Sequence, residues 1–218
     1  FLADDLGGLH GAIGAMAALR HRDQTGEGQH VDIALQDAML FQSDGLPTLG
    51  ALGIEPTRMG NEFGFAAPAN VYDCLDGAVY LGVLLDDHWK ILAPIIGEPE
   101  LAEHPTFATR DERAVNRDVC NMMVSEWAKQ LPREQVLKTL QTAGLPAAPV
   151  NTFPEAAKDP HVQERDMLQP IEFSNGVTMP ITGPAAKFSR TPTKVRSAAP
   201  DIGQHNEEIL TKIGMKTD

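Results

Sequence analysis

Two adjacent aspartates, Asp4 and Asp5, stand where a helical pattern begins, with Gly7 and Gly8 close behind them. One interpretation is structural, because a carboxylate at this place can cap a helix by accepting a hydrogen bond from a free backbone N–H. The other is chemical, because a carboxylate at a helix N-terminus lies in positive potential beside accessible N–H groups. Such a group could be an ionised nucleophile with oxyanion donors close by. Both interpretations stay open at this point, and capping is the commoner use of aspartate.

The histidines give weaker signals. His10 follows the aspartates by one helical turn or more, and we interpret it as a packed, hydrogen-bonded side chain. The other histidines that we considered are scattered without the spacing of metal ligands, and they are His30, His88, His104, His161 and His205. The sequence therefore predicts no metal site.

A second acidic pair, Asp86-Asp87, precedes His88 and Trp89, and it is more typical of a helix N-cap than of an acid-base pair. Gly26-x-Gly28 joins a helix to an expected strand, which is the reverse of the strand-to-helix order that cradles phosphate. We therefore exclude a phosphate loop there.

Charge and composition narrow the possible partners. The 218 residues carry 18 Lys and Arg against 30 Asp and Glu, a formal net charge of -12, without a basic run. Nucleic acid and anionic membrane surfaces are therefore poor partners. No apolar run approaches the roughly 18 residues of a membrane span. Cys74 and Cys120 lie far apart and suggest neither a disulfide framework nor zinc, so a reducing, cytoplasmic setting is expected.

The elements that must position these residues begin with a helix over about 6–21. Its larger apolar residues repeat every three or four positions, with Gly and Ala on the other faces, so we expect a central, buried helix. A turn, a strand over 29–35 and a helix over 36–44 should follow, as part of an α/β layer. Residues 45–68 are rich in Gly and Pro and are interpreted as a linker with little regular structure.

The rest of the chain predicts a different unit. Asp76-Gly77 and Asn175-Gly176 each lie between two strand-like segments and favour tight hairpin turns. Helices are expected over 87–96, 114–128, 133–143, 154–158 and 161–166, with Gly144 and Pro146 as a helix stop. Residues 62–185 should therefore form a compact α+β domain, followed by an extended tail over 191–200 and a last helix over 206–213.

Taken together, several segments resemble the class III CoA-transferases, the CaiB/BaiF family. The first is the run from Asp4 to His10, followed by an Ala- and Gly-rich helix and by residues 21–38. Further matching segments are 76–81, 105–109, 116–117, 143–151, 159–162 and 203–210. The resemblance covers essentially the whole sequence, in order.

The resemblance implies an α/β fold in which a large Rossmann-like domain, built from both ends of a longer chain, adjoins a smaller α+β domain. Residues 1–45 and 186–218 would belong to the large domain, 46–61 would be the linker, and 62–185 would be the small domain. Two subunits would interlock as a homodimer. The sequence starts at Phe1 without a signal-peptide pattern, and we interpret it as the C-terminal half of a larger protein, with most CoA-nucleotide contacts in the other half.

In activity, the resemblance implies CoA transfer between an acyl-CoA and a carboxylic acid, with CoA as substrate and no tightly bound cofactor. Asp4 would be the nucleophile, by its place six residues before His10, and would carry an aspartyl-CoA thioester. Gly7, Gly8 and His10 would lie near the reacting groups. Asp86 and the segment 63–65, Phe-Gly-Phe, would lie near the substrate if the small domain closes over the site.

Two alternatives remain. The similar 2-methylacyl-CoA racemases use the aspartate at the Asp4 position as one of two bases that move an α-proton. Their motif usually continues into a Gly-rich run and Ser-Met where this chain has Gly8, Leu9 and His10, and they place a Glu near Asp86. Both departures favour the transferase. The chain could also be a catalytically silent scaffold. Which acid is used stays open, from oxalate to carnitine-like, bile-acid and aromatic acyl groups.

Overall fold

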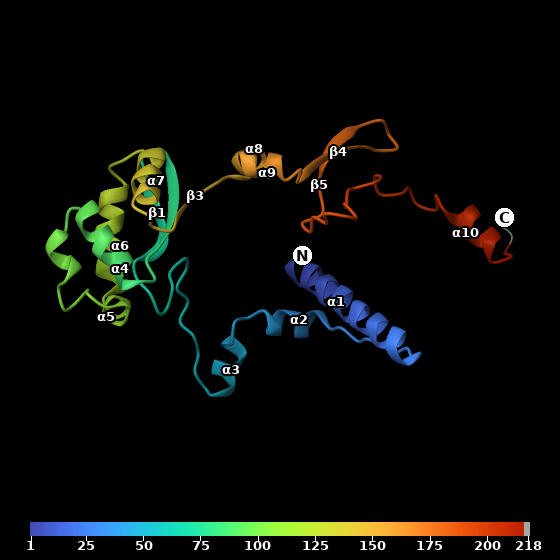
Figure 1. Cartoon of the computed structure of the whole chain (residues 1–218), viewed down its shortest axis with the longest axis horizontal. Helices are drawn as coiled ribbons and strands as arrows, with labels where there is room; N and C mark the ends of the chain where they lie inside the picture. The colour runs from blue at the N-terminus through green and yellow to red at the C-terminus, as the bar shows by residue number, and fades with distance from the viewer. Residues whose placement is uncertain (216–218) are drawn as a thin grey trace. The chain divides into compact units, whose positions relative to one another are not determined.

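The computed structural model describes residues 1–215, and contacts divide the chain into two units, Phe1–Gly60 and residue 61 onward. Each unit is described by itself (Figure 1). The first contains helices only, and the second contains two antiparallel sheets with helices. The finer division into 1–45, 46–61, 62–185 and 186–218 stays a prediction.

The first unit is built around one long helix, α1, which spans Leu2–Thr25. Gly26 caps its C-terminal end in a left-handed conformation, with a φ of 81°. The Gly26 N–H donates to the Arg22 carbonyl at 2.7 Å. The helix α2 spans Leu35–Phe41 and α3 spans Leu46–Ala51. The predicted helix is therefore confirmed and longer than expected, whereas α3 lies inside the expected linker.

The strand expected over 29–35 is wrong, because residues 27–34 have neither helical nor strand structure. A strand needs a neighbour for its N–H and C=O groups, and the described residues of this unit offer no other strand. Alternating polarity alone was therefore insufficient to make a strand here.

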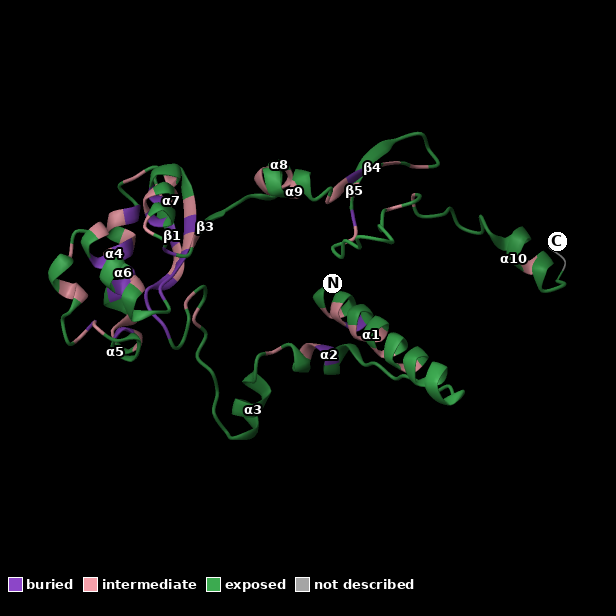
Figure 2. Cartoon of the chain, in the orientation of Figure 1, coloured by how far each residue is buried: buried purple, intermediate pink, exposed green. Residues whose placement is uncertain are grey.

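The glycines of α1 allow close packing on the following segment. A Cβ at Gly7 would lie 2.5 Å from Leu35 Cδ2, and one at Gly14 would lie 2.8 Å from Val31 Cγ1. Gly7 is the buried residue of α1. The apolar stripe is exposed instead, with Leu9, Ile13 and Met16 at 60–62% (Figure 2). The expectation of a buried, central helix is therefore wrong for this unit.

The second unit begins with a three-stranded antiparallel sheet of order β1-β2-β3, formed by Ala69–Cys74, Gly77–Gly82 and Ala147–Val150. The hairpin between β1 and β2 is confirmed, but its register pairs Cys74 with Gly77, so Leu75 and Asp76 are the turn residues. Gly77 has a φ of 155°, and a Cβ there would lie 3.0 Å from Arg133 Cδ. Glycine is needed at the first strand position rather than within the turn.

Helices cover this sheet and complete a core. They are α4 (Asp86–Ile95), the 3₁₀ helix η1 (Pro99–Ala102), α5 (Arg110–Val115), α6 (Arg117–Ala128) and α7 (Arg133–Thr142). The helix α6 packs on β1, and α7 packs on β2 and β3. The largest fully buried apolar side chains include Trp89, Leu81, Leu92 and Leu140. Purple segments in Figure 2 mark this core.

The structure has two helices where the sequence predicted one. The expected helix over 114–128 is divided at Asn116, which ends α5 and begins α6. The Asn116 side-chain amide donates to the carbonyls of Glu112, at 2.9 Å, and Thr106, at 3.3 Å. Asparagine competes with the helix for backbone partners in this way. The predicted stop of α7 is confirmed, because Gly144 has a φ of 76°.

The remaining elements are α8 (Phe153–Lys158), α9 (Pro160–Glu164), β4 (Leu168–Glu172), β5 (Thr178–Thr182) and α10 (Asn206–Lys212). The strands β4 and β5 form a separate hairpin, as expected from Asn175-Gly176. Gly176 has a φ of 78°, and the Asn175 side chain accepts the Val177 N–H at 3.0 Å. Residues 191–200 contain no helix or strand, as expected.

Candidate functional site

Asp4 lies in the first turn of α1, with its side chain exposed. The helix begins after Phe1, which is the N-cap residue, and no side chain caps it. Asp4 and Asp5 are therefore within the helix, and the interpretation of either as the cap is wrong. A carboxylate in the first turn of a long helix faces the positive end of its dipole. The geometry leaves Asp4 available for chemistry.

Gly7 and Gly8 lie beyond the first turn of α1. Their N–H groups fall within the helical hydrogen-bond ladder, where each bonds to the carbonyl four residues earlier. As oxyanion donors they would have to give up those bonds, which corrects the expectation of free N–H groups there. Gly8 has a different property: a Cβ there would meet nothing within 4 Å. Gly8 is one turn after Asp4 on the same face of the helix, so a larger side chain there would project next to Asp4.

His10 lies elsewhere on α1. Its ring packs edge-on against Phe41 of α2, with centroids 5.3 Å apart. It lines a cavity of about 280 Å³ between α1 and the segment 32–41, together with Asp32 and Asp37, and Asp4 is absent from the residues that line this cavity. Six helical positions separate the two side chains by about 120° around the axis. The interpretation of His10 as a packed side chain therefore fits better than direct participation with Asp4.

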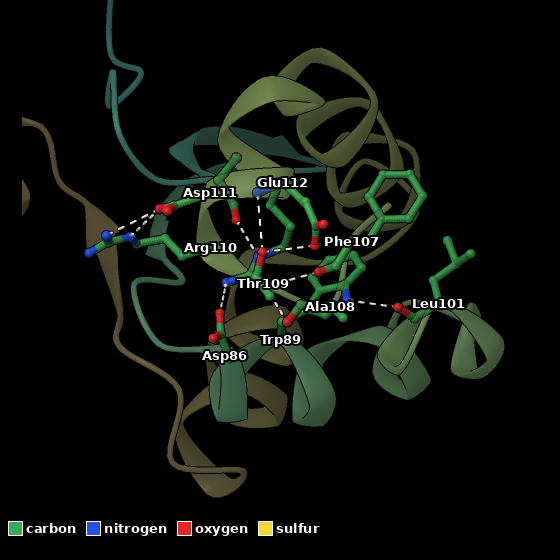
Figure 3. Close-up of polar contacts among 11 residues, drawn as sticks. Asp86, Trp89, Leu101, Phe107, Ala108, Thr109, Arg110, Asp111 and Glu112 are labelled. Carbon is green, nitrogen blue, oxygen red and sulfur yellow. Dashed lines mark hydrogen bonds and ion pairs between the residues drawn. The ribbon is translucent and has the colours of Figure 1, made fainter. Parts of the chain in front are cut away.

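Asp86 is the first residue of α4 in the second unit, and Leu85 is the N-cap, without a side-chain cap bond. Asp86 does not cap the helix, and its Oδ1 instead accepts from Arg113 Nη2 at 3.1 Å. The Arg113 side chain is fully buried, whereas that of Asp86 is 48% exposed. Figure 3 shows Asp86 and Trp89 among the polar contacts of this region.

Arg113 is the residue that sequence reasoning missed. Its Nε donates to the Ala67 carbonyl at 2.9 Å, and its Nη1 donates to the carbonyls of Phe107, at 2.9 Å, and Ala108, at 3.1 Å. Its guanidinium also lies 5.7 Å from the centre of the Trp89 ring. An arginine in a polar segment gives no signal of burial, because arginine is usually exposed. Only the three-dimensional contacts identify it.

The Phe63–Phe65 segment opens the second unit. The two phenyl rings pack edge-on at 5.4 Å and are 40% and 60% exposed. Beside them, Glu62 Oε1 accepts from Asn121 Nδ2 at 3.0 Å, and Asn121 Oδ1 accepts from the Tyr72 hydroxyl at 2.6 Å. Burial raises the pKa of Tyr72 well above its usual value, with smaller contributions from Cys120 and Glu62, so the hydroxyl stays a hydrogen-bond donor.

Neither a metal centre nor a membrane segment emerges from the described residues. Residues 1–215 hold no group of three or more His, Cys, Asp or Glu side chains that could bind a metal ion. None of the helices among them has the length and apolar character needed to cross a bilayer.

The structure thus divides the expected site residues between its two units. Asp4, Gly7, Gly8 and His10 all lie on α1 of the first unit. Asp86 lies in the second unit, in contact with Arg113.

Comparisons with known proteins agree with the sequence motifs. The model of a family described as CoA-transferase family III matches residues 1–206. The chain is 35% identical over 216 residues to the succinyl-CoA--L-malate CoA-transferase beta subunit of Chloroflexus aurantiacus. The alignment covers 97% of this chain and 53% of that protein. It is 32% identical over 209 residues to the succinyl-CoA:mesaconate CoA-transferase of Haloarcula marismortui. That alignment covers 94% of this chain and 52% of the relative.

A solved structure shares the fold. The crystal structure of a CaiB/BaiF family protein from Brucella suis superposes with a TM-score of 0.76 at 32% identity, covering 97% of this chain and 55% of that one. The mixed α/β fold therefore resembles that of the CaiB/BaiF structures. The chain spans about half the length of the relatives that it matches.

Proposed function

The chain belongs to CoA-transferase family III, and we propose on that premise that it moves CoA from an acyl-CoA donor to a carboxylic acid through an aspartyl-CoA thioester on Asp4. The observation that carries the proposal is the exposed Asp4 carboxylate, in the first turn of α1 and within the matched residues. CoA is a substrate in this scheme, and no other cofactor is required.

The proposed reaction has two symmetrical halves. The Asp4 carboxylate attacks the thioester carbonyl of the donor, which forms a mixed anhydride and releases the CoA thiolate. The thiolate attacks the Asp4 carbonyl carbon, which forms the aspartyl-CoA thioester and releases the donor acid as a carboxylate. The acceptor carboxylate then repeats these steps in reverse, takes the CoA and restores Asp4. Covalent catalysis of this kind divides one difficult exchange into steps of similar energy.

The neighbouring residues support this role in different ways. Asp4 attacks from the first turn of α1, at the positive end of the helix dipole. Gly8, one turn away, leaves room for the thioester, since even a Cβ there would meet nothing within 4 Å. Gly7 and His10 position α2 against α1 through Leu35 and Phe41. We therefore assign Gly7 and His10 to packing and Gly8 to access.

The setting of the reaction follows from the same proposal. Two relatives are named for succinyl-CoA with malate or mesaconate, so succinyl-CoA is the first donor to test and small dicarboxylic acids are the first acceptors.

We propose an interlocked homodimer in the cytoplasm, where reduced thiols and acyl-CoA esters coexist. Asp86 and the Phe63–Phe65 segment are proposed to lie near the substrate when the small domain closes.

The test uses the complete protein with succinyl-CoA alone, followed by hydroxylamine trapping and peptide mass mapping. A hydroxamate on the Asp4 peptide is expected, and Asp4→Ala should lower transfer by at least about 10³-fold because the acyl carrier is lost. Asp5→Ala is the matched control, since Asp5 is also exposed and lies in the same turn. It should change stability by less than about 1 kcal/mol and leave the adduct in place.

Other outcomes select the alternatives. Exchange of deuterium from heavy water into the α-carbon of a 2-methylacyl-CoA, without an adduct on Asp4, would identify the activity as racemisation rather than CoA transfer. Binding of acyl-CoA with neither an adduct nor exchange would indicate a silent scaffold.

A further inference from the structure

The turn between β4 and β5 presents an asparagine followed by a glycine. Ser174, Asn175, Gly176 and Val177 are all exposed. Among the asparagines of the whole sequence, Asn175 is the one that precedes glycine. Because glycine has no Cβ, the Gly176 nitrogen is less shielded than the backbone nitrogen that follows any other asparagine of the chain. The Asn175 carboxamide and the Gly176 nitrogen are therefore neighbouring groups that could react with each other.

A hydrogen bond holds the Asn175 carboxamide over the backbone that follows it. Its Oδ1 accepts the Val177 N–H at 3.0 Å, so the side chain is folded back toward the peptide bond between residues 175 and 176. The same N–H polarises the carboxamide carbonyl. It would also stabilise the negative charge that develops on Oδ1 when a nucleophile attacks Cγ, as an oxyanion donor does.

One hydrogen bond opposes such an attack. The Gly176 N–H donates to the Phe173 carbonyl at 2.9 Å, so the nitrogen must leave that bond and lose its proton before it can attack. The bond lies at the exposed end of a two-stranded hairpin. Exposed backbone hydrogen bonds with few buried neighbours open most readily. Local opening of this turn is therefore sufficient, and the rest of the chain can stay folded.

We infer that Asn175 is a site of spontaneous covalent modification in the folded protein, through a succinimide formed with Gly176. The Gly176 nitrogen loses its proton and bonds to Asn175 Cγ, the Cγ–Nδ2 bond breaks, and Nδ2 leaves as ammonia. Water then adds to either carbonyl carbon of the ring. Opening at Cγ gives aspartate at position 175, whereas opening at the other carbonyl gives isoaspartate, in which the main chain runs through Cγ. Water is the sole co-reactant, and nothing is oxidised or reduced.

The isoaspartate product would change the end of the hairpin, because it adds a methylene to the main chain between Ser174 and Gly176. The present turn allows two bonds of 2.9 Å, from the Gly176 N–H to the Phe173 carbonyl and from the Phe173 N–H to the Val177 carbonyl. Turn length and strand register are coupled, so a longer turn cannot keep both bonds. Both products also add a negative charge next to Ser174, whose hydroxyl donates to Asp201 Oδ1 at 3.0 Å.

The experiment incubates the complete folded protein at pH 8.5 and follows the peptide that contains residue 175 by liquid chromatography and mass spectrometry. Replacement of the amide NH₂ by OH gives a mass gain, and separate peaks distinguish aspartate from isoaspartate. Asn151 and Asn206 are internal controls, since both are exposed and are followed by Thr and Glu. Asn175 should convert at least about tenfold faster than either, because Gly176 has no Cβ. Isoaspartate should be among the products.

Asn175→Gln is the matched variant. It keeps a carboxamide at this position, but its extra methylene requires a larger and less readily formed ring, so the loss of ammonia there should disappear. Hydrogen exchange over residues 173–177 should become faster in the aged wild-type protein than in the fresh one. The aged and fresh samples of the variant should exchange alike.

Three results would overturn the inference. The first is conversion of Asn175 no faster than that of Asn151 and Asn206. The second is conversion in urea but not in the folded protein, which would show that the bond from the Gly176 N–H keeps the turn closed. The third is aspartate as the single product, which is the result of direct hydrolysis without a succinimide. None of these results depends on CoA transfer, so the inference and the proposed function are tested separately.

Discussion

Buried polar side chains in the second unit each hold segments together through specific partners. Arg113 joins α4 to the carbonyls of Ala67 and Phe107. Gln169 accepts the Val195 N–H at 2.8 Å and donates to Asp166 Oδ2 at 2.9 Å. Because an unsatisfied buried group costs about 1–3 kcal/mol, such residues specify one arrangement of loops. Loops that carry Asp86 are positioned in this way.

At the same scale, the two cysteines should differ in reactivity. Cys120 is fully buried, and burial raises the pKa of its thiol to about 11, so little thiolate forms near neutral pH. Cys74 is partly exposed, although burial and then Asp76 and Asp73 raise its pKa as well. Iodoacetamide at pH 8 is expected to label Cys74 slowly and Cys120 only after unfolding, as measured by peptide mass spectrometry. Rapid labelling of Cys120 in a folded Cys74→Ser variant would contradict this.

Among the elements, α8 shows how local signals and a distant contact combine. Thr152 and Glu155 form a reciprocal capping box, with the Glu155 N–H bonded to the Thr152 hydroxyl and the Thr152 N–H bonded to Glu155 Oε2. Arg133 at the start of α7 adds a bond of 2.7 Å to the other oxygen of Glu155. Hydrogen bonds from Arg133 and then from Thr152 lower the pKa of Glu155 from 4.5 to about 2.

That pKa gives a pH-dependent prediction. The folded state binds the Glu155 proton less tightly than the unfolded state, so its contribution to stability is present above about pH 4.5 and disappears as the pH falls toward 2. Glu155→Gln should therefore lower the midpoint of urea unfolding at pH 7, and the difference from wild type should vanish near pH 2. Glu164→Gln, at an exposed position on α9, is the control and should show no such trend. A difference independent of pH would refute the ionic contribution.

The two neighbouring glycines of α1 should separate packing from access. Gly7→Val should displace Leu35, since even a Cβ there would lie 2.5 Å from Leu35 Cδ2. Faster hydrogen exchange over residues 35–41 is expected. Gly8→Val should leave this exchange unchanged, because nothing lies within 4 Å, but should lower CoA transfer by filling the space beside Asp4. Equal effects of both substitutions on both measurements would contradict the assigned roles.

For the molecule as a whole, stability is concentrated in the core of the second unit. Leu92 and Leu140 have no exposed surface and belong to one apolar cluster that includes Trp89. Leu92→Ala is expected to lower the free energy of unfolding of this unit by about 2–5 kcal/mol, through lost burial and a residual cavity. Urea unfolding followed by tryptophan fluorescence measures it. Leu75→Ala, at a side chain 67% exposed, is the control and should cost much less.

Prediction from sequence succeeded where the signal was local. Gly144 ends α7 with a left-handed φ angle, and Asn175-Gly176 forms the β4–β5 turn. Prediction failed where the structure of a segment depends on the strand that pairs with it. The strand expected over 29–35 has no neighbour among the described residues of its unit, and the turn before Gly77 is displaced by one residue. A strand and its register depend on pairing, which a local pattern does not contain.

The amino-acid sequence by itself determined most of the helices, though not α3 or the division between α5 and α6. It also determined the two hairpins, the family motifs and the place of Asp4 near a helix start, because these depend on residues a few positions apart. Only the tertiary structure decided that Arg113 is buried against Asp86, 27 positions away in sequence. It also decided that the Leu35 side chain packs against Gly7. The physical reason is that burial and ion pairing are properties of segments brought together by folding. A side chain's own identity does not state which partner it will meet.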